Sequence, residues 1–251
     1  MMEILDDAAY ERLASVLGPA QEELVDRLGP QVGERWLDLP DASGAIALRA
    51  AGAGADVTVI DSVAPMIEKA RATAEEAGLA IRFDVGSVEY LPYDDGEFDV
   101  LASNFGFIVV SDHANVAAEL ARVTRAGGRL GFTAWKPNPK LGELYRSFSE
   151  EPLEGRESTE WGREDHVEDM LGEDFELEFS DGTLWIDARS GEELWELFST
   201  SAPPMAALLA RLDGERAEEF HRRFVELYES YREGDRIRAP RRYLLTLGTR
   251  R

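Results

Sequence analysis

The chain has 251 residues, 44% of them hydrophobic, which is enough for one sizeable core or for a core domain with a smaller cap. Its 50 acidic residues against 27 lysines and arginines give a formal charge of −23, which argues against nucleic acid or an anionic membrane surface as a partner, because like charges repel. The lack of cysteine excludes disulfides, thiolate metal sites and cysteine nucleophiles.

Neither a secretion signal nor a membrane anchor is predicted. The first residues, MMEILDDAAYERL, are acidic and amphipathic, unlike a signal peptide. No apolar run approaches the roughly 20 residues needed to span a bilayer. We therefore expect a soluble, cytoplasmic protein.

The first 136 residues alternate predicted helices and strands. Apolar residues at helical spacing predict one or two helices ending near Gly29 and Pro30. Predicted strands follow at 35–39, 56–60, 80–85, 98–103 and 129–135, with helices at 44–53, 64–77 and 113–124. This alternation predicts an α/β fold with a Rossmann-like, doubly wound, mostly parallel sheet.

The pattern changes after residue 136. Residues 137–160 are polar with little periodicity, which predicts a connector or an open cap segment. Further helices are predicted at 161–171, 191–200, 203–212 and 215–231, a hairpin around Asp181 and Gly182, and a last strand at 241–250. Ser190 and Glu193 predict a capping box. We expect a cofactor-binding core at 1–136, an inserted helical cap with late strands at 137–238, and an antiparallel terminal strand at 239–251.

Two acids stand at predicted strand ends. Asp38 ends the first strand and Asp61 ends the second. In this architecture ligands bind at the carboxyl ends of the strands, and an acid about 20 residues past the first loop can accept hydrogen bonds from both hydroxyls of an adenosine ribose. The alternative is that Asp61 only caps the helix that follows it.

Several linked blocks resemble the class I S-adenosylmethionine-dependent methyltransferases, particularly the small-molecule group that includes quinone-biosynthesis enzymes. WLDLPDASGAIAL stands at the first strand and glycine motif, and VTVIDSVAPMIEKAR at the second strand with its ribose acid. GSVEYLPYDDGEFDVLASNFGF matches the adenine segment and fourth strand, and ELARVTRAGGRLGFTAW the fifth strand with its preceding helix. The resemblance implies methyl transfer from S-adenosylmethionine to a small-molecule acceptor that the sequence does not identify.

The resemblance also implies which residues bind the cofactor. The residues implied near the methionine moiety are Asp38, Ala42 and Gly44, and those implied at the ribose are Asp61 and Ser62. The residues implied around the adenine are Met66, Ser87 and Val88, and those implied near the sulfonium and the acceptor are Asn104 and Phe105. For Met66 and Phe105, ordinary core packing is an equally good interpretation.

Three residues depart from the family pattern. Ala42 replaces a glycine, at a cost of roughly 1–2 kcal/mol if that position needs a positive φ. Asp41 adds a carboxylate near the cofactor's own, and their repulsion is on the order of 3 kcal/mol at an effective dielectric near 20. The repulsion is smaller if Asp41 turns to solvent, and the alternative is that Asp41 pairs with the cofactor's ammonium group. Ser87 replaces an acid that bonds the adenine amino group, unless Glu89 or Asp84 compensates. The alternative hypothesis is therefore a methyltransferase fold with a degenerate cofactor site, acting as a binding or partner module.

Histidines supply the remaining candidates for acid–base chemistry. His113 opens a predicted helix and is a candidate general base, although a solvated first-turn histidine is the simpler interpretation. His166 and His221 lie on acidic helices and are expected to face solvent. No histidine cluster with metal-ligand spacing occurs, so no metal is expected.

Aromatic and basic residues of the second half complete the predictions. The stretch RIRAPRR is expected to pair with the acidic body of the protein. The aromatic residues expected to fill the interior of the cap, as a second small core, are Trp161, Trp185, Trp195, Phe198, Tyr228 and Tyr231.

Overall fold

The computed structural model describes residues 7–39, 44–149 and 159–251. The chain forms two compact units, which divide the predicted cap between them. The core unit consists of Pro19–Lys136, Glu157–Gly182 and Tyr243–Arg251, and the small unit of Met1–Gly18, Pro137–Arg156 and Thr183–Arg242.

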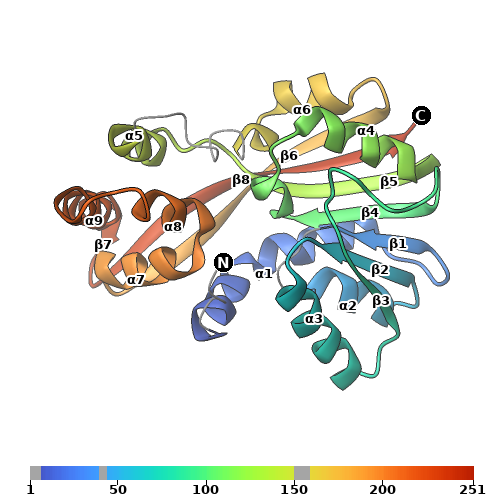
Figure 1. Cartoon of the computed structure of the whole chain (residues 1–251), viewed down its shortest axis with the longest axis horizontal. Coiled ribbons are helices and arrows are strands. Elements are labelled where there is room, and N and C mark those ends of the chain that lie inside the picture. Colours follow the sequence, from blue (N-terminus) through green and yellow to red (C-terminus); the bar gives the residue numbers. More distant parts are fainter. Residues whose placement is uncertain (1–6, 40–43, 150–158) are drawn as a thin grey trace. The chain divides into compact units, whose positions relative to one another are not determined.

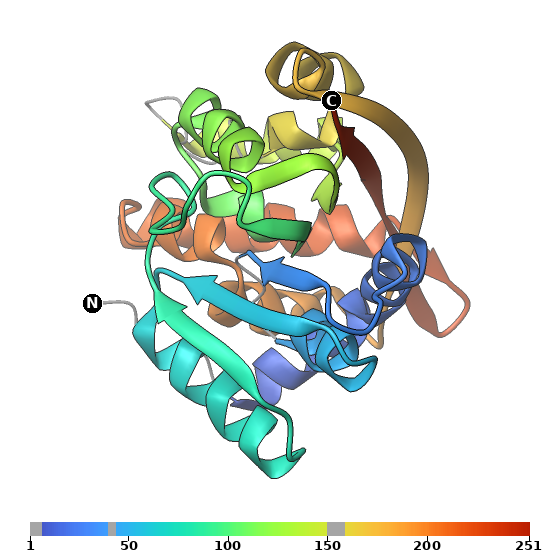
Figure 2. The same ribbon diagram turned by 90° about the vertical axis from the view of Figure 1, so that its right-hand side faces the viewer.

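The strands form one eight-stranded sheet in the order β3-β2-β1-β4-β5-β8-β6, with β7 paired to β8. They are β1 (Arg35–Asp38), β2 (Asp56–Asp61), β3 (Ile81–Val85), β4 (Phe98–Asn104), β5 (Thr124–Trp135), β6 (Phe175–Ala188), β7 (Arg232–Glu233) and β8 (Arg236–Arg250). The pairs among β1 to β5 are parallel, and β8 runs antiparallel to β5. The predicted fold class, a mostly parallel Rossmann-like sheet with an antiparallel terminal strand, is confirmed (Figures 1 and 2).

The helices are α1 (Asp7–Leu28), α2 (Ala45–Gly52), α3 (Ala64–Glu76), the 3₁₀ helix η1 (Gly106–Val109), α4 (His113–Val123), α5 (Pro139–Phe148), α6 (Glu164–Leu171), α7 (Gly191–Ser201), α8 (Pro203–Leu209) and α9 (Gly214–Glu229). None of the described helices is both long enough and apolar enough to cross a membrane.

Helices cover both faces of the sheet in the core unit. On one face lie α2, α3 and the end of α1, and on the other lie α4 and α6 (Figure 1). Alternation along β5 explains the two faces, because Gly131 packs under Leu24 and Leu28 of α1 while Phe132 joins a buried cluster with Trp161. Burial on both faces accounts for the continuous apolar runs of the central strands.

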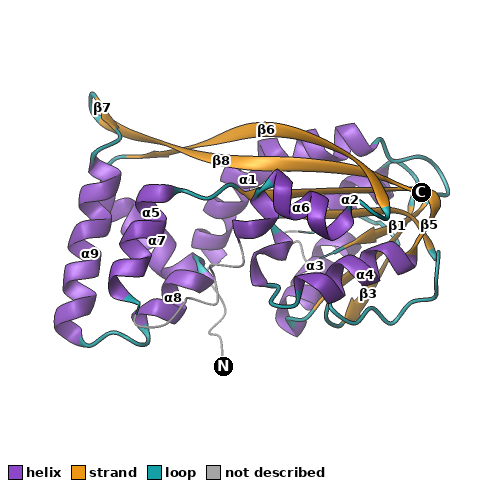
Figure 3. Ribbon diagram, turned by 90° about the horizontal axis from the view of Figure 1, so that it is seen from above, coloured by secondary structure: helices purple, strands orange, loops and turns teal. Residues whose placement is uncertain are grey.

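The predicted hairpin around Asp181 and Gly182 is wrong. A single strand, β6, continues through both residues and lies beside β8 (Figure 3). Gly182 makes room rather than a turn, since a Cβ added there would lie 2.0 Å from the ring of Tyr243. A glycine in a strand is often required for such close approach, which the sequence alone does not distinguish from a turn.

The prediction of an irregular segment at 137–160 is also wrong in its first part. Residues 139–148 form α5, whose first turn is capped because the N–H of Leu141 donates to Asn138 Oδ1 at 3.1 Å. Asn138 followed by Pro139 is a helix-start signal that the weak periodicity concealed. Residues 150–158 lie outside the described part of the chain.

The small unit has its own apolar core around Phe220, Phe224 and Tyr228 of α9. Trp195, Phe198 and Tyr231 pack against it, which confirms the second small core for these residues and Tyr228. One half of the predicted capping box is confirmed, because the N–H of Glu193 donates to Ser190 Oγ at 3.2 Å. The Glu193 carboxylate accepts the N–H of Arg189, the residue before the N-cap, at 2.8 Å.

Two members of the predicted aromatic set lie elsewhere. Trp161 is fully buried in the core unit, and Trp185 is 46% exposed. The guanidinium of Arg238 lies over the Trp185 ring, 4.6 Å from its centroid. Within the described residues Arg236 and Arg238 make no ion pair, so the expected pairing of RIRAPRR with acidic residues is wrong for these two.

Gly162 and Gly52 provide a matched test of backbone packing in the core unit. A Cβ at Gly162 would lie 2.0 Å from the backbone oxygen of Trp135, whereas nothing lies within 4 Å of one at Gly52. We expect Gly162→Ala to lower the free energy of unfolding by about 3 kcal/mol. Gly52→Ala, at a helix end, should be neutral or stabilising by up to about 1 kcal/mol. Chemical denaturation measures both, and equal stabilities of the two variants would contradict this packing.

Candidate functional site

The carboxyl ends of β1, β2 and β4 bring three polar side chains to one edge of the sheet. Asp38, Asp61 and Asn104 are the last residues of these parallel neighbours. The chain turns in opposite directions from β1 and β4, so this edge contains the topological switch point where α/β sheets bind ligands. The acids that the sequence placed at strand ends are therefore neighbours in the fold.

Asp38 is fully buried and holds the start of α2. The N–H of Ala47 donates to Asp38 Oδ2 at 3.1 Å. A carboxylate here satisfies an N–H of the first helical turn and is favoured by the positive end of the helix dipole. Asp38 therefore positions the loop and the helix that follow β1.

Gly44 occupies the N-cap of α2 with φ 64°, in the left-handed region that favours glycine. A Cβ there would also lie 3.2 Å from Cβ of Ala70 in α3. The glycine thus permits both the turn into α2 and the close approach of α3. Asp41 and Ala42 lie outside the described residues, so the expected effects of these two departures stay predictions.

Asp61 presents a half-buried carboxylate at the end of β2. Its Oδ1 accepts the N–H of Val63 at 2.8 Å, an interaction that orients the carboxylate at the start of α3. Burial raises the pKa of Asp61 above its ordinary value, while the N–H groups of Val63 and Ser62 act in the opposite direction. The helix-capping and ligand-binding interpretations are compatible, because a carboxylate oxygen can accept more than one hydrogen bond.

A hollow of about 140 Å³ is lined by Ser62, the residue that directly follows Asp61. It is smaller than the 300–1,000 Å³ typical of whole ligand pockets, so it matches one ring system of a larger ligand. Gly86 of the lining packs closely on β2, since a Cβ there would lie 2.9 Å from Cδ1 of Ile60. The residues that line the hollow are Ser62, Gly86, Ser87, Val88, Glu89, Val110 and Ser111.

The two carboxylates that could have replaced the missing adenine acid are both engaged. Glu89 Oε1 accepts the N–H groups of Ser111 and Asp112, each at 3.0 Å, and the Ser111 hydroxyl at 3.1 Å. These bonds, that of Asp112 first, hold the pKa of Glu89 below its ordinary value. Asp84 Oδ2 accepts the hydroxyl of Tyr93 at 3.0 Å and pairs with Arg82. Both carboxylates thus already accept hydrogen bonds from the protein, and Glu89 also lines the hollow, so compensation for Ser87 by either of them stays a prediction.

The hollow is lined by two of the residues assigned to adenine, Ser87 and Val88. The third, Met66, lies on α3. Ser87 Oγ accepts the N–H of Glu89 at 3.1 Å, which leaves the hydroxyl hydrogen for another partner. Val88 is buried in the core cluster and Met66 is half-buried in the first turn of α3. The sequence identified Ser62, Ser87 and Val88 in the lining but missed Gly86, which directly precedes Ser87. It also missed Val110 and Ser111, because a contact between distant loops leaves no local pattern.

Phe105 directly follows Asn104 and is largely buried. Its ring stacks on that of Trp135, with 3.9 Å between centroids. Asn104 Oδ1 accepts the hydroxyl of Thr133 at 2.7 Å. Both residues lie at the carboxyl edge of the sheet, and Phe105 also contributes to packing.

His113 is buried, so the interpretation as a solvated first-turn residue is wrong. Its Nδ1 lies 2.8 Å from Nε2 of His166, and its ring packs beside that of Trp161 at 5.1 Å between centroids. His166 is half-buried in the same cluster rather than facing solvent. These histidines join α4 to α6, a structural role that the sequence spacing did not indicate. In the small unit, His221 pairs with Glu192 at 2.7 Å and stacks on Trp195.

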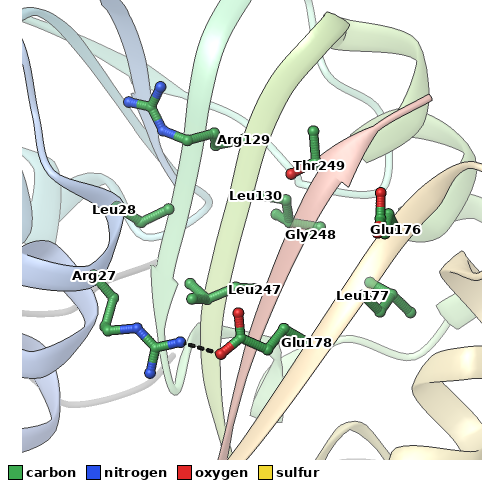
Figure 4. Close-up of a pocket in the computed structure, with 10 residues that line it drawn as sticks. All are labelled: Arg27, Leu28, Arg129, Leu130, Glu176, Leu177, Glu178, Leu247, Gly248 and Thr249. Carbon is green, nitrogen blue, oxygen red and sulfur yellow. Dashed lines mark hydrogen bonds and ion pairs between the residues drawn. The ribbon is translucent and has the colours of Figure 1, made fainter.

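A larger hollow, of about 430 Å³, lies on the face of the sheet rather than at its carboxyl edge (Figure 4). An ion pair between Arg27 and Glu178 crosses it. Arg129 lies at the start of the paired part of β5. Its Nη2 donates to both carboxylate oxygens of Glu34, each at 2.9 Å. The full lining is Arg27, Leu28, Arg129, Leu130, Glu176, Leu177, Glu178, Leu247, Gly248 and Thr249. Of the four charged residues in this lining, two pair with each other and Arg129 pairs with Glu34 outside it.

A model of the methyltransferase domain matches residues 37–132. Over 185 residues the chain is 33% identical to the uncharacterized protein Rv1403c of Mycobacterium tuberculosis, covering 72% of this chain and 66% of that protein, just under two thirds of its length. Over 231 residues it is 30% identical to Rv1405c of the same organism, covering 88% and 82%. It is also 36% identical over 133 residues to the demethylmenaquinone methyltransferase of Thermus thermophilus, covering 51% and 60%.

Solved structures share the fold. The YcgJ protein of Bacillus subtilis matches with a TM-score of 0.61 at 19% identity, covering 94% of this chain and 98% of that one. The geranyl diphosphate C-methyltransferase of Streptomyces coelicolor, in complex with Mg²⁺, geranyl diphosphate and S-adenosyl-L-homocysteine, matches with a TM-score of 0.55 at 18% identity, covering 93% and 80%. At these identities the likeness concerns the fold alone.

The capping role of Glu89 predicts a pH-dependent loss of stability. Because the pKa of Glu89 is lowered in the folded protein, its contribution is present above the ordinary glutamate value of 4.5 and is lost as the pH falls through the lower folded value. We expect Glu89→Gln to cost about 1 kcal/mol at pH near 7, and nothing where the carboxyl is protonated. Thermal unfolding against pH tests this, with Glu75→Gln on the exposed face of α3 as control. An equal loss at every pH would contradict it.

Proposed function

The chain belongs to the class I S-adenosylmethionine-dependent methyltransferases, and on this premise we propose that it transfers a methyl group from S-adenosylmethionine to a small molecule. The main support for this proposal is the Asp61 carboxylate at the end of β2, with a ring-sized hollow beside it at the carboxyl edge of the sheet. An adenosine needs this combination, because its ribose hydroxyls are donors to a carboxylate and its base is a flat, largely apolar ring.

We assign the cofactor-contacting residues as follows. Asp61 and Ser62 would hold the ribose, while Ser87, Val88 and the nearby Met66 would bound the adenine. The turn at Gly44, held by Asp38, would bring the loop before α2 to the methionine moiety. Asn104 and Phe105 would lie nearest the sulfonium and the acceptor. These assignments rest on the shared edge of the sheet and on the family resemblance.

The bound cofactor supplies a methyl group already activated on a sulfonium. The protein then mainly has to hold an acceptor in line with that methyl group and exclude water, and such positioning can account for much of a rate enhancement. His113 is not assigned a role in the reaction, because its ring is committed to His166 and Trp161.

The ribose assignment predicts the effect of one substitution. Asp61→Ala removes a charged acceptor, and each hydrogen bond to such a group contributes about 1.5–3 kcal/mol to binding. We therefore expect the affinity for S-adenosylhomocysteine to fall at least about tenfold. Asp56→Ala, at the exposed opposite end of β2, should leave it unchanged. Isothermal titration calorimetry measures both. No heat from the unaltered protein at millimolar ligand would contradict the proposed function and favour the alternative of a binding or partner module with a degenerate cofactor site.

The departures at Asp41 and Ala42 predict a gain of affinity. If the added carboxylate and Cβ weaken cofactor binding, the double variant Asp41→Gly, Ala42→Gly should bind S-adenosylhomocysteine about tenfold to a hundredfold more tightly. Asp41→Asn, which keeps the side-chain size, separates the charge from the Cβ. Unchanged affinity in the double variant would show that neither residue weakens the site.

A further inference from the structure

Three aromatic rings and a carboxylate meet where β4, β5 and β8 adjoin at the carboxyl edge of the core unit. Tyr243 of β8 is the register partner of Trp135 in β5. The ring of Phe105 stacks on Trp135 and meets Tyr243 edge-on, with 5.8 Å between centroids. The hydroxyl of Tyr243 donates to Glu23 Oε2 of α1 at 2.7 Å. This cluster stands beside the residues that we assign to the sulfonium and the acceptor.

The Tyr243 ring is held in place from the neighbouring strand. Gly182 of β6 has no side chain, and a Cβ there would lie 2.0 Å from the ring. The residue is only 4% exposed, whereas Glu23 is exposed on α1. The hydroxyl therefore links a buried position at the edge of the sheet to a carboxylate in contact with water.

The neighbouring Asn104 has an unsatisfied donor. The Thr133 hydroxyl accepts the N–H of Phe105 at 3.1 Å and donates to Asn104 Oδ1, which directs the Asn104 amide nitrogen away from Thr133. This nitrogen, in a side chain that is 4% exposed, has no hydrogen-bond partner among the described residues. An unpaired buried donor requires an explanation, and an acceptor atom on a ligand provides one.

The backbone at Phe105 adds a second sign of function. Phe105 has φ 58° and is the one non-glycine residue with a positive φ in the described part of the chain. Such conformations are unfavourable for a side chain and collect at binding and catalytic sites.

We propose that Tyr243 relays a proton from the methyl acceptor to Glu23, and that the acceptor is a small aromatic compound with a hydroxyl group, a phenol. The inference rests on the proposed function. The Asn104 amide would donate to the phenol oxygen, the aromatic rings would pack against its ring, and its O–H would donate to Tyr243 Oη. An amine acceptor fits less well, because its single nitrogen lone pair attacks the methyl group and none is left for the Asn104 donor.

The proposed proton relay balances the transfer. The phenol oxygen forms a bond to the methyl group, and the sulfur keeps the electron pair of the bond that breaks. Positive charge growing on the oxygen makes its proton acidic, so this proton moves to Tyr243 Oη as the Tyr243 proton moves to Glu23. Glu23 becomes neutral and, being exposed, returns the proton to water. Burial and the Glu23 carboxylate both raise the pKa of Tyr243, which keeps the phenol group protonated and able to act as a relay.

Binding of chromophoric probes tests the inference without knowledge of the natural acceptor. In saturating S-adenosylhomocysteine, we expect 4-nitrophenol to bind about tenfold more tightly than 4-nitroanisole, which lacks the O–H, and than 4-nitroaniline. Tyr243→Phe and Glu23→Gln should each reduce this preference severalfold with little change in melting temperature. Glu22→Gln, the adjacent exposed glutamate on α1, should keep it.

Three results would overturn the inference: no preference for 4-nitrophenol (including no binding at all), tighter binding of 4-nitroaniline, or an unchanged preference in both Tyr243→Phe and Glu23→Gln. A merely structural Tyr243–Glu23 contact would alter melting temperature and leave probe selectivity intact. Calorimetry with S-adenosylhomocysteine on the same samples separates the two proposals. Absent cofactor binding contradicts the proposed function, whereas cofactor binding without phenol selectivity contradicts the relay alone.

Discussion

The carboxylate of Asp38 is the interaction on which the arrangement of the site depends. It ends the central strand β1, is fully buried, and accepts the N–H of Ala47 in the first turn of α2. A buried carboxylate is costly unless hydrogen bonds and a favourable field stabilise it, and a helix N-terminus supplies both. This contact fixes where α2 begins, and α2 in turn sets the position of Gly44 and of α3 behind it.

Close approach between backbones and side chains is the second constraint in the core unit. Gly131 admits α1 onto the sheet, Gly182 admits the ring of Tyr243, and Gly86 admits Ile60 beneath the ring-sized hollow. In each case a methyl group would overlap its neighbour, so these glycines serve packing rather than flexibility. The hollow beside Asp61 and the aromatic cluster at Tyr243 both depend on such positions.

Polar groups around the site divide into those that hold the structure together and those that we propose contact a ligand. Glu89 caps the turn before α4, and Asp84 is shared by Tyr93 and Arg82. Asp61, by contrast, keeps a half-buried carboxylate at the edge, and Asn104 keeps a buried donor. Asp61 and Asn104 are therefore the polar groups at this edge that we propose contact a ligand.

The order of elements, the parallel sheet and the placement of Asp38 and Asp61 at strand ends could be predicted from the sequence, because they follow from local periodicity and from rules of chain connection. The continuous β6, the burial of His113 against His166 and the pairing of Tyr243 with Glu23 could not. Each depends on a contact between residues far apart in the chain, such as Gly182 with Tyr243, and no short-range pattern encodes such a contact. The sequence by itself thus determined the scaffold and its ligand-binding edge. Only the tertiary structure decided which polar groups at that edge form hydrogen bonds within the protein, because their partners are residues far away in the chain.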